Sequence, residues 1–134
     1  GADFIVSPGA TDALFGIAED HALPFLPGAV TASEVLKAIE HGYTVLKFFP
    51  AETSGGAPAI GALAGPFPGV SFMPTGGITR DNLGTYLALN SVSAVGGSWL
   101  TPKQLMIDQA WDDIYAGAVE TVAQAEAIKT GDGQ

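Results

Sequence analysis

TVLKFFPAE, residues 44–52, places a single basic residue, Lys47, inside an apolar run that Pro50 ends. A short run of bulky and β-branched residues bounded by a proline predicts a β-strand. Side chains alternate along a strand, so Val45, Lys47 and Phe49 share one face. The other face is apolar as well, which predicts a strand covered on both sides. Lys47 is then either an edge lysine with its amine in water or an amine placed for chemistry.

Similar apolar runs precede and follow this one, and a helical pattern comes after each. The predicted strands lie within 3–9, 22–30, 44–52, 69–77 and 92–99. The predicted helices cover 11–21, 34–42, 57–65, 79–90 and 111–129, and a frayed tail follows at 130–134. Strict alternation with short links predicts one α/β domain, 1–134, built on a parallel sheet. That sheet is either open and doubly wound or part of a (β/α)8 barrel.

Four threonines give helix start signals. Thr31 opens a capping box with Glu34, and Thr101 opens another, TPKQ, in which Pro102 takes the first helical position. Thr11 and Thr79 can cap the helices that follow them.

Composition narrows the possible partners. The chain has 134 residues and a formal net charge of −9, which argues against nucleic acid and against an anionic membrane surface. There is no cysteine and there are only two histidines, so we expect no metal site. No stretch is long enough to span a bilayer and no signal peptide opens the sequence, so we expect a cytoplasmic protein.

The unusual residues gather where strands end, which is where parallel α/β folds place their sites. PTGGI (74–78) and GGSW (96–99) each put a glycine pair where a strand gives way to a helix. Backbone N–H groups there can hold an anion without basic side chains, and the Ser98 hydroxyl can add a donor. Glycine at such turns can also serve the backbone alone.

Lys47 has a chemical role open to it at the end of its strand. Apolar surroundings favour the neutral form of an amine, and a neutral amine can attack a ketone to form a Schiff base. Glu52 follows closely and can act as an acid or base. The plainer interpretation, which we prefer, is an acidic residue near a helix start, where the helix dipole favours it.

Taken together, GADFIVSPG (1–9), LPGAVTASEV (26–35), KFFPAE (47–52), GPFPGVSFMPTGGI (65–78) and VGGSWL (95–100) resemble a known family in order and spacing. This is the family of class I aldolases that cleave 2-keto-3-deoxy-6-phosphogluconate (KDPG) or 4-hydroxy-2-oxoglutarate (KHG). The resemblance implies a lyase that releases pyruvate and an aldehyde through a Schiff base. It also implies a (β/α)8 barrel, a homotrimer, and no metal or other cofactor.

The resemblance also implies roles for individual residues. Lys47 would be the Schiff-base lysine, Pro8 and Phe49 would line the pyruvyl pocket, and Thr75 would contact the keto acid. The distal phosphate or carboxylate would be held by Gly76, Gly77, Gly97 and Ser98.

The resemblance begins at what corresponds to the fourth strand of the barrel, so the five βα units match strands 4–8. The glutamate base of the family, a substrate-binding arginine and a threonine near the carboxylate have no counterpart in these residues. We therefore predict a truncated barrel, partial or smaller but closed, in preference to a flat open sheet. The alternative function is that of a (βα)5 remnant or fragment with little or no turnover.

Overall fold

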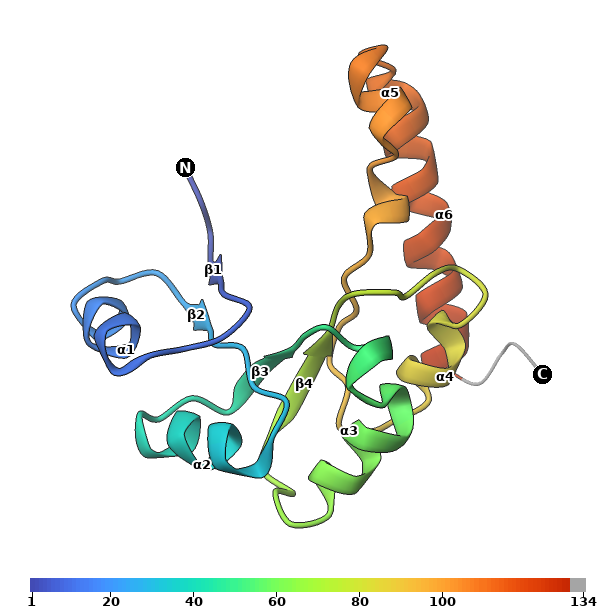
Figure 1. Ribbon diagram of the computed structural model, residues 1–134. Coiled ribbons are helices and arrows are strands. Elements are labelled where there is room, and N and C mark those ends of the chain that lie inside the picture. Colours follow the sequence, from blue (N-terminus) through green and yellow to red (C-terminus); the bar gives the residue numbers. More distant parts are fainter. Residues whose placement is uncertain (131–134) are drawn as a thin grey trace.

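The computed structural model describes residues 1–130 (Figure 1). The strands are β1 (Ile5–Val6), β2 (Phe25–Leu26), β3 (Val45–Phe48) and β4 (Ser71–Pro74). The helices are α1 (Asp12–Glu19), α2 (Ala32–Glu40), α3 (Gly56–Ala64), α4 (Leu83–Leu87), α5 (Lys103–Ile107) and α6 (Trp111–Thr130), and two 3-10 turns are η1 (Glu52–Ser54) and η2 (Ser98–Leu100). Strands and helices alternate from β1 to α4, as predicted.

Neighbouring strands are consecutive in the sequence and parallel. β1 pairs with β2, and β3 pairs with β4 in the register Lys47↔Met73. A bridge between Gly28 and Lys47 joins the two pairs. These pairings confirm the α/β class and the parallel sheet.

The fifth predicted strand, 92–99, does not form as a strand. Its contact with β4 consists of two isolated bridges, Phe72↔Val92 and Thr75↔Gly96. Three steps on β4 (72 to 75) therefore face four steps on the partner segment (92 to 96). The surplus residue breaks the ladder in the manner of a β-bulge.

The predicted closed barrel is not formed in residues 1–130, where the sheet remains small and open. The β1–β2 ladder is only two residues long. A ladder this short gives little of the tilt and stagger that closure requires. The correspondence to strands 4–8 of a barrel stays a prediction.

β3 is covered on one face only, which corrects the expectation of a strand covered on both. Leu46, Phe48 and Phe72 are completely buried in the core that the helices cover. On the opposite face Val45 is 41% exposed and Lys47 is half-buried. The described residues do not fold back over this face, so the Lys47 side remains open.

Two of the predicted helix starts are confirmed. Thr31 and Glu34 form the reciprocal capping box of α2, and the Thr11 hydroxyl accepts a hydrogen bond from the Leu14 N–H at the start of α1. α2 ends before Gly42, whose φ of +82° suits glycine.

The starts predicted at Thr79 and Thr101 are wrong. The Asn82 side-chain oxygen accepts a hydrogen bond from the Thr79 N–H at 2.7 Å, and α4 begins only after Asn82. The Thr101 N–H donates to the Ser98 carbonyl and closes η2. Pro102 is then extended, with ψ 132°, and α5 begins at the residue after it.

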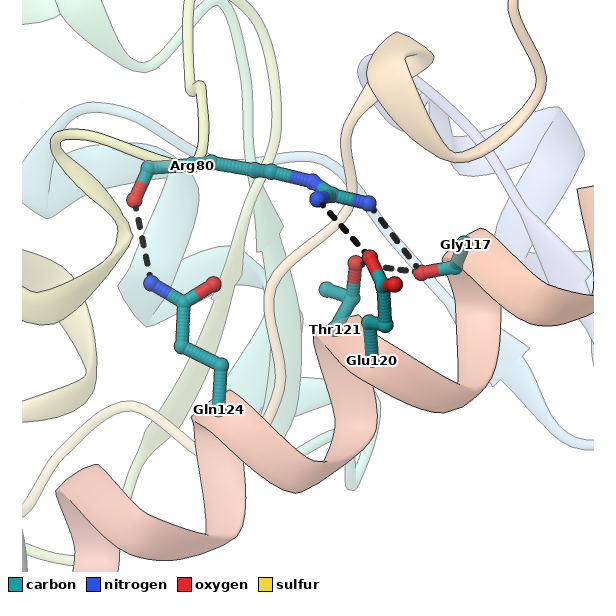
Figure 2. A network of polar contacts seen from close by, with 5 residues as sticks. All are labelled: Arg80, Gly117, Glu120, Thr121 and Gln124. Carbon is teal, nitrogen blue, oxygen red and sulfur yellow. Dashed lines mark hydrogen bonds and ion pairs between the residues drawn. The ribbon is translucent and has the colours of Figure 1, made fainter.

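α6 and α5 extend away from the sheet as a helical arm (Figure 1). Arg80 connects α6 to the loop after β4 (Figure 2). Its guanidinium donates to Glu120 Oε2 at 3.2 Å and to the Gly117 carbonyl at 3.3 Å. The Arg80 carbonyl accepts a hydrogen bond from the Gln124 side chain. α6 continues to Thr130, the first residue of the predicted frayed tail. The rest of that tail, 131–134, lies outside the described residues.

In residues 1–130, no helix combines the length and the hydropathy that crossing a bilayer requires.

Candidate functional site

The carboxyl ends of the strands meet along one edge of the sheet, because all the pairings are parallel. The neighbours along this edge are Pro8 after β1, Gly28 after β2, Lys47 on β3 with Phe49 directly after it, Thr75 after β4 and Gly96 beyond the bulge. Each strand thus brings one of the segments singled out in the sequence to the same edge.

Lys47 and Phe49 lie on the open face of β3. The Lys47 amine lies 4.7 Å from the centroid of the Phe49 ring, within range of a cation–π contact when the amine is charged. Lys47 is opposite Met73, and the Thr75 N–H donates to the Phe48 carbonyl, so Thr75 lies opposite Phe49. Within residues 1–130 the Lys47 amine forms neither an ion pair nor a hydrogen bond. An open, uncompensated amine with an aromatic neighbour is suited to react with a small carbonyl compound.

Phe49 also touches the glycine turn. A Cβ on Gly76 would lie 3.2 Å from the Phe49 ring and 3.2 Å from the Pro50 Cα, and Gly76 has a φ of +102°. Both the space and the backbone conformation therefore favour glycine at position 76. The contact joins the amine side of the site to the turn after β4.

Thr75 carries a buried hydroxyl that has no hydrogen-bond partner in residues 1–130. Its side chain packs against Gly96, where an added Cβ would lie 2.8 Å from Thr75 Oγ1. A buried hydroxyl without a partner is costly, and such groups recur at functional sites. Thr75 is therefore placed beside Lys47 and Phe49 with its hydrogen-bonding capacity unused.

Four backbone N–H groups near this edge have no acceptor in residues 1–130. They belong to Gly76, Gly77, Gly97 and Ser98. The bridge between Thr75 and Gly96 holds the two segments side by side. Unpaired N–H groups on adjacent strand ends are suited to bind an anion.

Trp99 explains the glycine at position 97. Gly97 has an ordinary extended φ of −156°, but a Cβ there would overlap the Trp99 ring. No role was predicted for Trp99.

Pro8 lies two strands from the amine in the pairing order, as Gly97 and Ser98 do on the other side. It is exposed, and its backbone packs so closely on Gly28 that a Cβ at position 28 would overlap the Pro8 carbonyl. Gly28 in turn bridges Lys47. The sequence contained one signal for this arrangement, the Pro27–Gly28 pair at the end of a strand.

The side chains of two charged residues near the glycine turn each have a partner within residues 1–130. The Arg80 guanidinium points to α6, where it contacts Glu120 and the Gly117 carbonyl (Figure 2). Glu52 is the first residue of η1, as the plainer interpretation predicted, and its carboxylate accepts a hydrogen bond from the Tyr86 hydroxyl. A cavity of about 390 Å³ lies beside this pair, with Gly56 and Asn82 also in its wall.

Fold and site together define an α/β protein with a lysine-centred site at the carboxyl edge of a parallel sheet. The family model for KDPG and KHG aldolases matches residues 1–117. The chain belongs to this aldolase family.

Individual relatives agree with the family match. The 2-dehydro-3-deoxy-phosphogluconate aldolase of Pseudomonas aeruginosa is 47% identical over 114 residues, which cover 85% of this chain and 52% of that protein. The KHG/KDPG aldolase of Escherichia coli K12 is 44% identical over 126 residues, covering 94% of this chain and 59% of that protein. The chain thus spans little more than half the length of these curated relatives.

One solved structure is similar over nearly the whole chain. It is the KDPG aldolase of Legionella pneumophila, in which pyruvate was captured as a covalent carbinolamine intermediate. Its TM-score is 0.82 at 37% identity, and the match covers 97% of this chain and 58% of that one.

Proposed function

We propose that this chain carries the imine-forming site of a class I aldolase that releases pyruvate and an aldehyde from KDPG or KHG. The observation that carries the proposal is the Lys47 amine. It is half-buried, unpaired within residues 1–130, and placed beside Phe49 and Thr75 at the carboxyl edge. The carbinolamine reported for the Legionella relative is the first covalent species that this chemistry requires.

The reaction follows from the amine. Neutral Lys47 adds to the C2 ketone of the substrate, and loss of water gives the imine. The protonated imine accepts the electron pair of the C3–C4 bond when the C4 hydroxyl loses its proton, and the aldehyde departs. A proton then adds at C3, and water hydrolyses the imine to pyruvate and the free amine.

The remaining site residues bind the two ends of the substrate. Phe49 and Pro8 would bound the space for the pyruvyl group, and the unused Thr75 hydroxyl would hydrogen-bond the keto acid. The N–H groups of Gly76, Gly77, Gly97 and Ser98 would hold the distal phosphate or carboxylate, assisted by the Ser98 hydroxyl.

Proton transfer decides between the proposed activity and the alternative of a chain with little turnover. No carboxylate or imidazole of residues 1–130 pairs with the Lys47 amine. A positioned acid or base contributes about 10²–10⁴-fold to such a rate. We therefore expect the 134-residue chain to form the imine readily and to turn over slowly, unless a further chain of a homo-oligomer such as the family's trimer supplies the group.

The test is to incubate the chain with pyruvate and borohydride and to map the product by peptide mass spectrometry. We expect a reduced pyruvyl adduct on Lys47 that Lys47→Ala abolishes and that Lys103→Ala, a change at an exposed lysine, leaves intact. Labelling of Lys47 no stronger than that of Lys37, Lys103 or Lys129 would reject the proposal. A trapped adduct without aldehyde release from KDPG would select the alternative.

A further inference from the structure

Tyr86 joins α4 to the site through one hydrogen bond. Its side chain is 1% exposed, and its hydroxyl donates to Glu52 Oε1. Burial, together with the hydrogen bond and the negative charge of Glu52, raises the pKa of the Tyr86 hydroxyl well above its ordinary value.

Glu52 in turn supports the glycine turn after β4. Its N–H donates to the Gly76 carbonyl at 3.1 Å. The stem of its side chain lies against the next residue, because a Cβ on Gly77 would come within 2.6 Å of Glu52 Cγ and 2.8 Å of Glu52 Cβ. Gly77 has a φ of +78°, so it is held in a conformation that glycine tolerates and other residues rarely adopt.

A second contact secures the same turn from the other side. The Asn82 side chain donates to the Gly77 carbonyl at 3.3 Å while its oxygen accepts the Thr79 N–H. Glu52 is exposed, so its carboxylate would be free to move away if nothing retained it. Tyr86 is the residue that retains it.

We propose that Tyr86, acting through Glu52, is a positioning residue that aims the Gly76 and Gly77 N–H groups at the distal anion of the substrate. The proposal rests on the function proposed above and assigns separate roles to two parts of the site. Lys47 governs imine formation with the keto acid, and the Tyr86–Glu52 pair governs affinity for the phosphorylated end. Loss of the pair would weaken anion binding without affecting the amine.

The experiment measures both activities in the same chain. Affinity for inorganic phosphate is read from the backbone amide resonances of Gly76 and Gly77, and imine formation from pyruvate trapping at Lys47. In Tyr86→Phe we expect the dissociation constant for phosphate to rise about three- to tenfold, as loss of one hydrogen bond predicts, with trapping unchanged.

Three further variants separate positioning from packing. Glu52→Met keeps an unbranched stem against Gly77 but removes the acceptor, and because Glu52 is exposed we expect a folded chain with the same loss. Glu52→Gln keeps an acceptor for the Tyr86 hydroxyl, so its dissociation constant for phosphate should stay within about twofold of that of the parent. Tyr43→Phe is the matched control, because Tyr43 packs on Phe15 and Phe25, away from the turn.

Unchanged phosphate affinity in Tyr86→Phe and Glu52→Met would overturn the proposal, as would an equal loss in Tyr43→Phe. Absence of any phosphate response at Gly76 and Gly77 in the parent chain would also overturn it. Failure of the function proposed above is recognised separately, as absence of trapping at Lys47 in the parent.

Discussion

At the scale of single residues, Phe49 determines how the two halves of the site meet. Its ring lies near the Lys47 amine on one side and contacts Gly76 on the other. Alternation along β3 was sufficient to predict that Lys47 and Phe49 share a face. The contact with Gly76 could not be predicted, since it depends on the register between β3 and β4 and on the conformation of the turn.

Gly76→Ala should destabilise the chain by roughly 1–3 kcal/mol, because alanine at a φ of +102° is strained and its methyl group would press on the Phe49 ring. Urea denaturation followed by circular dichroism measures the change. Gly61→Ala is the control: position 61 lies inside α3 with open space around it, so alanine there should be neutral or stabilising by up to about 1 kcal/mol. Equal stability of the two variants would contradict the account of the turn.

At the scale of elements, capping chemistry could be read from the sequence where it is local. The capping box of Thr31 and Glu34 involves residues three apart, and it formed as predicted. The starts at Thr79 and Thr101 failed because, within residues 1–130, neither threonine hydroxyl accepts a backbone N–H, and α4 and α5 begin later, after Asn82 and Pro102.

Thr31→Ala should lower the free energy of unfolding by about 1 kcal/mol, the usual cost of losing an N-cap. The hydroxyl accepts from the Glu34 N–H at 3.3 Å and donates to Glu34 Oε2 at 2.8 Å. Thr11→Ala should cost less, because the Thr11 hydroxyl makes the single capping bond to Leu14 at 3.3 Å. Chemical denaturation of both variants gives the ranking, and the reverse order would contradict it.

The same cap gives stability a pH dependence. Partial burial tends to raise the pKa of Glu34, but hydrogen bonds from the Val30 N–H and from the Thr31 hydroxyl and N–H outweigh it and leave the pKa below 4.5. A depressed pKa means that the unfolded chain binds the proton more readily than the folded chain does. The stabilisation that ionised Glu34 gives the folded chain is therefore fully present above the ordinary carboxyl pKa, and it is lost as pH falls through the folded pKa. Glu34→Gln should therefore cost more stability at pH 7 than at pH 3, measured by urea denaturation. A pH-independent difference would refute this.

At the scale of the whole molecule, local patterns predicted the order of the elements, but they did not predict how far the sheet closes. Consecutive parallel pairing follows from short βα links. The surplus residue between Val92 and Gly96, which interrupts the last ladder, is a mismatch between two distant segments. The packing of Gly28 on Pro8 and the bond from Tyr86 to Glu52 also join residues far apart in the chain, so neither was predicted.

Arg80→Ala should loosen α6 from the rest of the molecule. The variant loses the contacts to Glu120 and to the Gly117 carbonyl, which join the loop after β4 to the arm. Because the Arg80 side chain is 46% exposed, the change in unfolding free energy should stay within about 1 kcal/mol. Hydrogen exchange should nevertheless accelerate in α6 and remain unchanged in α2. Lys103→Ala, an exposed change in α5, is the control, and unaltered exchange in α6 would show that the Arg80 guanidinium does not help to secure this helix.

The open face of β3 has a kinetic consequence. Since nothing in residues 1–130 folds over the Lys47 side, a carbonyl compound can reach the amine by diffusion without waiting for a lid to move. Selection among ketones and aldehydes would then depend on their intrinsic electrophilicity and on how long the Phe49 surface and the glycine turn retain them. An open amine of this kind selects among carbonyl compounds by how long each stays bound, whereas an enclosed amine would select them by size.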